Sequence, residues 1–466
     1  MIRRARIVIA IVAALHALFF IWYQRPDWTA HWPDQDGYRR LGQVLAETGR
    51  FTRFPDAPRF VPEVIRTPVY PAFVAVVYRL FGAGQLQVAL AQAVLFVLLC
   101  LMTHGVARRI AGEPIATGAA LAVALFPPFP YFGALVLTEL WTTVLFTASM
   151  AVAVAALHTR RTATFCWLGL LLGITTLSRP VFVLLPLALA AVGLVVLPML
   201  SVTKRPTPAP WLAMLAAFAL TMAPWFAYNY VTLGRFTLSP AGGIGRGLWE
   251  GSWQATWSGR VQKELTDLAD DIDDRGELNR RVGAVAERER VSAAPMLDYV
   301  HQWEDIRRIW EAPVDPYERA LARVKADEEY RRVAIENLRR DSFAHLTKRI
   351  ARGIFILWAG EIPFRYSDIN ALPPIVIYAC WALQAVLIAL AIAGLVTLVR
   401  AKRITDAVLL ATPLVYITVV HTPLLTEARQ SLPAQPIVLL LAAIGAAHLV
   451  GRSLPREPQV HEAEHL

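Results

Sequence analysis

The sequence predicts an all-α, polytopic membrane protein with about ten transmembrane helices, juxtamembrane helices on its outer face and a helical extramembrane insertion. Hydrophobic residues make up 56% of the 466 positions, and the mean hydropathy is +0.44. Apolar runs of roughly 18 or more residues recur along the chain, which is the length that a helix needs to cross a bilayer. Helices follow because hydrocarbon offers no partner to free backbone N–H and C=O groups. This pattern excludes a soluble enzyme with a large core.

Ten predicted spans follow from these apolar runs. They cover residues 5–23, 85–107, 114–131, 137–157, 163–178, 180–199, 209–229, 372–399, 405–421 and 432–450. Short basic clusters fall on alternate sides of successive spans, and Lys and Arg accumulate on the cytoplasmic side of membrane proteins. The clusters are MIRRAR at the start, 107–109, 158–161, 203–205, 400–403, and Arg452 with Arg456. We therefore expect an even number of crossings and both termini in the cytoplasm.

Two long segments interrupt the short connections, and both fall on the outer face. The first covers residues 24–71 and the second residues 230–370. In the second, Asp315 before a proline marks a helix start, and apolar residues then recur at spacings of three and four. This amphipathic helix is predicted to lie over the membrane or over the first loop. Residues 349–362 are too short to cross and predict an interfacial or re-entrant helix.

One membrane domain is expected over residues 1–451, followed by a short cytoplasmic tail at 452–466. The net charge of +10 does not indicate nucleic acid, because the cationic residues sit in juxtamembrane clusters and mixed-sign loops. The three cysteines each lie inside an apolar run and predict packing rather than a disulfide or metal framework. No His, Cys and Asp cluster has metal-ligand spacing, so no cofactor is expected, although a divalent ion near the first-loop acids stays possible.

Ionisable residues at the outer ends of the spans are the candidates for chemistry, because such groups are costly at membrane depth. They are Asp34, Asp36, Glu63, Arg66, Glu139, Arg179, Glu427 and Arg429. Any one alone is equally well explained as an interfacial anchor. All of them map to the same face, however, so one site could gather them. Arginine donates bidentate hydrogen bonds to phosphate, and a nearby carboxylate can take a proton from a hydroxyl or amine.

Several motifs, in order along the chain, resemble the GT-C integral-membrane glycosyltransferases. The relevant group contains protein O-mannosyltransferases, lipid A aminoarabinose transferases and lipopolysaccharide sugar transferases. The motifs are PDQDGYRRLGQVLAETGRF from residue 33, RTPVYPAFVAVVYRLFG from residue 66, LTEL at 137–140, and the segments 173–186, 228–252 and 421–443. Together they spread over most of the chain. In that group a Pro-Asp-x-x-x-Tyr pattern follows the first span, as Asp34 and Tyr38 do here, and a Tyr-Pro stretch like that at Tyr70 leads a juxtamembrane helix.

The resemblance implies transfer of a sugar, with inversion, from a polyprenyl-monophosphate donor. Asp34 would be the general base and the arginines would bind phosphate. Asp36 competes for the base role, although its spacing from Tyr38 matches the pattern less well. Some relatives carry an acidic residue just before the Pro-rich stretch. Here Arg66 occupies that neighbourhood and Glu63 lies three residues earlier, so a second catalytic carboxylate stays open.

Two further signals leave alternatives open. His421, at an outer helix end, could bind phosphate or donate a proton, or it could make a structural hydrogen bond. GGIGRG at 242–247 looks like a phosphate loop, but no strand precedes it and no Lys-Ser/Thr follows, so a flexible connection is expected instead. It could also line the acceptor cleft.

The sequence thus predicts a multi-pass enzyme of a bacterial cytoplasmic membrane whose active site faces the periplasm. Its partners would be a lipid-linked sugar donor, membrane lipids, and a glycolipid, polysaccharide or protein acceptor. The main alternative is a transporter or flippase of a lipid-linked sugar, which would favour ionisable or broken-helix sites near the midplane. A non-catalytic envelope scaffold is a third possibility.

Overall fold

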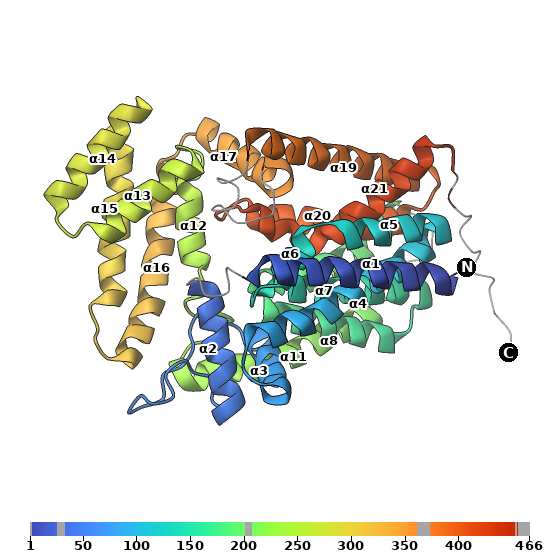
Figure 1. Cartoon of the computed structure of the whole chain (residues 1–466), viewed down its shortest axis with the longest axis horizontal. Helices are drawn as coiled ribbons and strands as arrows, with labels where there is room; N and C mark the ends of the chain where they lie inside the picture. Colours follow the sequence, from blue (N-terminus) through green and yellow to red (C-terminus); the bar gives the residue numbers. More distant parts are fainter. Residues whose placement is uncertain (1, 26–32, 201–206, 361–372, 453, 455–466) are drawn as a thin grey trace.

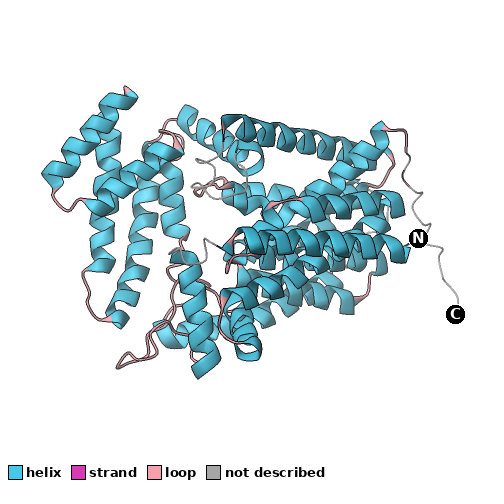
Figure 2. Ribbon diagram, viewed as in Figure 1, coloured by secondary structure: helices cyan, strands magenta, loops and turns pink. Residues whose placement is uncertain are grey.

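The computed structural model describes residues 2–25, 33–200, 207–360, 373–452 and 454. All regular elements within these ranges are helical, as the sequence predicts (Figure 2). Long helices lie side by side in a bundle, and a group of more polar helices projects from one end of it (Figure 1). The start of α1 and the end of α21 lie at the opposite end, which agrees with an even number of crossings.

Eight helical segments of the described ranges are long and apolar enough to cross a membrane. They are α1 (Ile2–Tyr23), α4 (Gln85–Ala111), α7 (Thr138–Thr159), the segment Pro180–Leu200, α11 (Ala209–Leu233), α19 (Pro374–Arg400), α20 (Ile404–His421) and the segment Ala428–Leu449. The other two predicted spans are shorter. The first consists of α5 (Glu113–Leu125) and α6 (Pro128–Gly133), separated before Pro127 and Pro128, and the second is α8 (Thr162–Ser178).

Glycines let some of these helices approach closely. A Cβ on Gly394 of α19 would lie 1.9 Å from the carbonyl oxygen of Leu441, and one on Gly445 of α21 would lie 2.1 Å from that of Leu390. Gly169 of α8 faces α11 in the same way. Small residues at helix interfaces are typical of membrane bundles, where packing rather than exclusion of water drives association.

The first outer loop contains α2 (Pro33–Thr48), an irregular segment, and the juxtamembrane helix α3 (Val69–Phe81). The two helices pack closely because Gly42 of α2 leaves room for the side chain of Val74. Tyr70, at the start of α3, is fully buried. The predicted Tyr-Pro helix therefore exists, and it fixes the end of the loop against the bundle. Residues 26–32 of this loop lie outside the described ranges.

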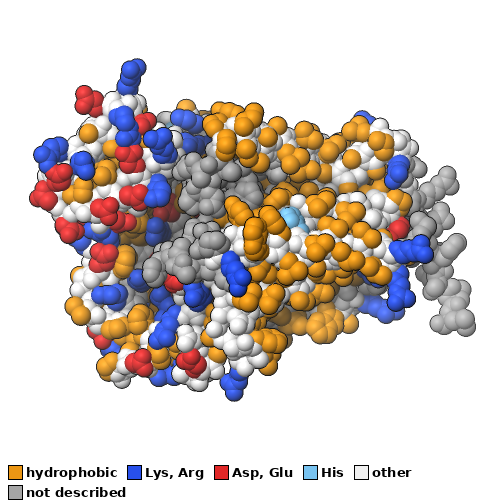
Figure 3. Space-filling view, in the orientation of Figure 1, with side chains coloured by type: hydrophobic (Ala, Val, Ile, Leu, Met, Phe, Trp, Pro, Cys, Tyr) orange, Lys and Arg blue, Asp and Glu red, His pale blue; other side chains and the backbone are white. Residues whose placement is uncertain are grey.

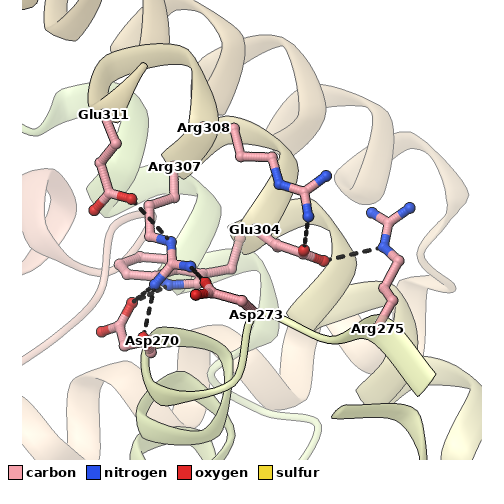
Figure 4. A network of polar contacts seen from close by, with 8 residues as sticks. Asp270, Asp273, Arg275, Glu304, Arg307, Arg308 and Glu311 are labelled. Carbon is pink, nitrogen blue, oxygen red and sulfur yellow. Dashed lines mark hydrogen bonds and ion pairs between the residues drawn. The ribbon is translucent and has the colours of Figure 1, made fainter. Parts of the chain in front are cut away.

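The second outer segment folds into a helical insertion. Its helices are α12 (Ile244–Trp253), α13 (Gly259–Asp271), α14 (Arg275–Glu289), α15 (Ala293–Glu311), α16 (Pro316–Arg340) and α17 (Phe343–Phe355). Trp249 is fully buried and stacks on Tyr299 in its core. Arg307 of α15 contacts Asp270 and Asp273, which ties α15 to α13 and the turn after it (Figure 4). The insertion thus has a core of its own and is not a solvated tether.

Helix α16 lies over the first loop, so one of the two predicted placements is confirmed. Its Ala320 and Val324 pack on Val61 and Val64. Asp315, at its N-cap, accepts a hydrogen bond from Arg59 at 2.9 Å. The helix predicted over residues 349–362 begins earlier, at Phe343, and exposes apolar side chains such as Ile350 and Ile354. Charged side chains gather over the insertion and the first loop, whereas apolar ones cover the bundle (Figure 3).

Candidate functional site

Asp34 lies in the first turn of α2 and faces Arg66 at the other end of the loop. Its Oδ1 is 3.7 Å from Nη2 of Arg66, and its side chain is 64% exposed. Gly37 makes this approach possible, because a Cβ there would lie 2.1 Å from Nη2 of Arg66. The carboxylate is therefore beside a cation and still open to solvent. That combination suits a group that must accept a proton from a water-borne molecule.

A buried glutamine, which sequence reasoning missed, fixes the start of α2. The Oε1 atom of Gln35 accepts hydrogen bonds from the backbone N–H of Val136 at 2.9 Å and from Gln85 at 3.2 Å. Gln35 thereby ties Asp34 to the segment that precedes Glu139. The only available signal was an amide between two aspartates, which by itself indicates no particular role.

Asp36 points to a different environment. It forms an ion pair with Arg39, at 3.8 Å on the same helix, and its side chain is 42% exposed. The geometry around Arg66 therefore favours Asp34 for a role in the site, although both residues belong to the same helical turn.

Glu63 lies behind Arg66 and is almost completely buried. It contacts Nε of Arg53 at 2.7 Å and Nη1 of Arg66 at 3.9 Å, and its Oε1 accepts the backbone N–H of Ile65 at 2.9 Å. These contacts fold the loop into a tight turn and hold Arg66 in place. Glu63 is thus placed to position Arg66, and its burial does not favour direct contact with a substrate.

Two tyrosines form the floor below Arg66. The guanidinium lies 4.9 Å from the ring centre of Tyr38, which meets Tyr70 edge to face at 5.0 Å. Burial raises the pKa of Tyr38 to about 12, against the opposing effect of Arg66. Tyr38 therefore stays protonated at physiological pH and can donate a hydrogen bond. Tyr70 in turn donates to Gln92 at 3.4 Å, which anchors it to α4.

Arg429 and Glu139 meet across the bundle. Nη1 of Arg429, in the turn before α21, is 3.5 Å from Oε1 of Glu139 at the start of α7. Nε of Arg429 also donates to Glu427 at 2.9 Å. The second oxygen of Glu139, Oε2, is buried and has no hydrogen-bond partner among the described residues. Because buried polar atoms are almost always paired, this oxygen is placed to accept a hydrogen bond from a bound molecule.

Arg179 and His421 contribute further unpaired nitrogens. Nη1 of Arg179 and Nδ1 of His421 are both buried without a hydrogen-bond partner in the described part of the chain. The charge of Arg179 acts on both Tyr38 and His421, and the charge of Asp34 acts on Arg429. The arginines of two distant hairpins thus lie within electrostatic range of the first loop.

The predicted site residues therefore lie near one another, but they differ in how far each side chain is exposed to solvent. Asp34 and Tyr38 both lie against Arg66, and Glu139 pairs with Arg429, while electrostatic effects relate Arg179 to Tyr38 and His421, and Arg429 to Asp34. Tyr70 packs against Tyr38, and Glu63 contacts Arg66, so both help to hold these residues in place. Within the described residues no three His, Cys, Asp or Glu side chains are arranged to hold a metal ion.

The glycine-rich segment at 242–247 serves the insertion. Gly243 adopts a left-handed conformation, with φ of 84°, and α12 begins directly after it. The carboxylate of Asp327 on α16 accepts the backbone N–H groups of Gly245 and Arg246 at 3.1 and 3.2 Å. A carboxylate of the chain itself thus occupies the position that an anion would take at this helix start. The expectation of a connection rather than a nucleotide site agrees with this geometry.

Comparison with solved structures finds proteins of similar fold. The archaeal oligosaccharyltransferase AglB from Archaeoglobus fulgidus, in complex with an inhibitory peptide and a dolichol-phosphate, matches with a TM-score of 0.51 and 14% identity, over 95% of this chain and 50% of AglB. Its apo form matches with a TM-score of 0.50 and 15% identity, over 94% and 50%. ArnT from Cupriavidus metallidurans, bound to undecaprenyl phosphate, aligns with a TM-score of 0.41 and 15% identity, over 94% and 78%.

The match to a family model covers part of the sequence. Residues 65–228 match the family model of dolichyl-phosphate-mannose-protein mannosyltransferases. The chain spans about half the length of the oligosaccharyltransferase that it matches. No curated protein matches the chain. The resemblance thus extends to the fold and to a family model over residues 65–228, and the prediction of an all-α, multi-pass membrane protein is confirmed.

Proposed function

We propose that the protein is an inverting glycosyltransferase that moves a sugar from a polyprenyl monophosphate to an acceptor. The reaction would take place at the outer, periplasmic face of a bacterial cytoplasmic membrane. The observation that carries this proposal is the surroundings of Asp34. This exposed carboxylate pairs with Arg66, and the charges of Arg179 and Arg429 interact with residues of the same loop.

The donor phosphate is assigned to Arg179 and Arg429. Nη1 of Arg179 is buried and unpaired, and Arg429 is held by Glu139 and Glu427 at 3.5 and 2.9 Å. Arginine suits a phosphate because its planar fork donates charge-assisted bonds in pairs. The polyprenyl chain is already solvated by lipid, so recognition has to come from phosphate and sugar. Negative charge builds on the phosphate as it leaves, and preorganised guanidinium groups then stabilise the transition state more than the ground state.

Asp34 is assigned the role of general base. It takes the proton of an acceptor hydroxyl, whose oxygen attacks the anomeric carbon of the donor sugar. The bond from this carbon to the phosphate oxygen breaks as the new bond forms, and the phosphate keeps the electron pair. Inversion requires base and leaving group on opposite faces of the sugar. The placement of Asp34 on the loop and of Arg429 on the bundle supports this arrangement.

Comparative mass spectrometry of envelope glycolipids and glycoproteins tests the proposal. We compare cells with the wild-type protein, without it, with Asp34→Asn and with Asp36→Asn. Asp34→Asn is expected to lower the modification about 10²- to 10⁴-fold, as loss of a general base does, with normal protein abundance. Asp36→Asn serves as the matched control from the same helical turn and is expected to retain most of it.

Normal modification with abundant Asp34→Asn protein would contradict the assignment of the base. A transporter of a lipid-linked sugar would instead move labelled lipid across liposomes without changing it chemically. Transfer that survives treatment with EDTA would support chemistry that needs only the arginines. Loss of transfer on EDTA treatment would point to the divalent ion that the sequence leaves possible.

A further inference from the structure

A groove runs along the start of α1, on the side that meets α4. It has a volume of about 500 Å³ and is lined by Ile2, Arg3, Arg6, Ile7, Ala10 and Leu101. The five residues from α1 recur at spacings of three and four, so they lie on one face of that helix. Ligand pockets typically have volumes of about 300–1,000 Å³, so the groove has room for a small molecule or a headgroup.

This groove lies at the end of the bundle opposite the candidate functional site. The start of α1 is remote from the helical insertion and from α2, which carries Asp34 (Figure 1). Basic side chains are visible at this end of an otherwise apolar bundle surface (Figure 3). A ligand in the groove is therefore separate from the donor phosphate assigned to Arg179 and Arg429.

The two arginines of the groove lack an acidic partner. Neither α1 nor α4 contains an Asp or a Glu. Glu113, at the start of α5, contacts His104 at 3.1 Å instead. Within the described ranges no ion pair involves Arg3 or Arg6. Residues three positions apart on a helix are neighbours, so both guanidinium groups can reach the same anion.

The rest of the lining is apolar, which favours a ligand with both an anionic group and a hydrocarbon part. Ile7 and Ile11 of α1 are 50% and 53% exposed, as residues that face lipid are. A second copy of the chain does not fit the groove, because a symmetric contact would bring the same arginines together. Arginine donates charge-assisted hydrogen bonds in pairs to a phosphate. With two cations and no acid, the groove favours a headgroup with net negative charge over a zwitterionic one.

We propose that this groove binds one phospholipid with a net negative headgroup. The phosphate lies between Arg3 and Arg6, and the glycerol backbone and first acyl carbons lie against Ile7, Ala10 and Leu101. The site belongs to the leaflet remote from Asp34, which the expected topology assigns to the cytoplasm. Because the lipid contacts both α1 and α4, its binding stabilises the folded bundle. This inference does not depend on the proposed glycosyl transfer.

Native mass spectrometry of the delipidated full-length protein tests the site. Phosphatidylglycerol and phosphatidylcholine with the same acyl chains are titrated in a non-ionic detergent, and the dissociation constant of the first bound lipid is measured for each. The wild type is expected to bind phosphatidylglycerol about tenfold more tightly or better, because basic residues attract anionic headgroups. Arg3→Gln combined with Arg6→Gln is expected to remove most of this preference.

Two matched controls separate the groove from its surroundings. Arg108→Gln combined with Arg109→Gln removes two exposed arginines from the last turn of α4, outside the lining, and is expected to keep the preference. Ala10→Leu fills the groove while both arginines remain, so tight binding of phosphatidylglycerol should be lost. Val8→Leu, at an exposed position of α1 outside the lining, should retain it.

Equal affinity of the wild type for both lipids would overturn the proposal. An equal loss in the two double variants would do the same, because it would show diffuse attraction by surface charge, and so would undiminished binding to Ala10→Leu. Displacement of phosphatidylglycerol by an equal concentration of glycerol phosphate would assign the groove to a soluble phosphate instead of a lipid. Thermal unfolding without lipid shows whether each variant is folded. Added phosphatidylglycerol is expected to raise the Tm of the wild type but not that of the variant without Arg3 and Arg6.

Discussion

Asp34 owes its environment to its neighbours in the first loop. Gly37 has no side chain that could collide with Arg66. Glu63 contacts that arginine as well, and Gln35 fixes the start of α2 through its hydrogen bond with the backbone of Val136. Each of these three residues helps to place Asp34 and Arg66 beside each other. Arg66 in turn acts as a fixed positive charge beside a carboxylate that stays open to water.

Substitution of Gly37 by alanine tests this arrangement. The added Cβ would lie 2.1 Å from Nη2 of Arg66, so the guanidinium must move away from Asp34 and Tyr38. Transfer is expected to fall about tenfold or more, which corresponds to loss of a charge-assisted contact of about 1.5 kcal/mol. Alanine favours helix, so α2 itself should not be weakened.

Gly283→Ala is the control for this change, because that helical glycine has open space around its Cβ position. It is expected to leave the rate of transfer unaltered. If Gly37→Ala were as active as Gly283→Ala, the contact between Asp34 and Arg66 would not matter for the reaction.

At the scale of elements, the insertion connects the two loops that carry the arginines. Helix α16 packs on the first loop, while α12 binds the segment before Arg429, where Gln254 donates to the carbonyl of Thr426 at 2.8 Å. Asp327 joins α16 to the start of α12. The insertion is therefore placed to set the distance between the first loop and the last hairpin.

Asp327→Ala should loosen this connection. It leaves the N–H groups of Gly245 and Arg246 without their acceptor, at a cost of about 1–3 kcal/mol in stability. Glu329→Ala removes a more exposed ion pair with Arg332 and should cost about 0–1 kcal/mol. Thermal unfolding in detergent compares the two variants. A larger loss for Glu329→Ala would show that Asp327 does not fasten α12.

At the scale of the whole molecule, the bundle and its one-sided polar end define the orientation in the membrane. We expect a cysteine at Glu287, on the exposed face of α14, to react with an impermeant thiol reagent added to intact cells. One at Thr162, the exposed first residue of α8, should react only after permeabilisation. The wild type, whose Cys100 is buried and whose other cysteines lie in helices of the bundle, gives the background. The reverse pattern would invert the proposed topology.

Hydropathy and positive charge were enough to predict the bundle, because both are local in sequence. The convergence of Asp34 with Arg66, and of Glu139 with Arg429, followed from topology once each residue had been assigned to one face. Sequence could not reveal the supports. Gln35 and Gln92 acquire meaning only through partners about 100 and 40 residues away, Val136 at a separation of 101 and Gly133 at 41.

The central claim is that one site gathers the base from the first loop and the arginines from distant hairpins. A cryo-EM map of the full-length protein with a bound polyprenyl monophosphate tests it most directly. We predict phosphate density within hydrogen-bonding reach of Arg179 and Arg429, with the carboxylate of Asp34 across the same cleft on the side of the aqueous loop. Phosphate density elsewhere on the molecule, out of reach of both arginines, would contradict the account.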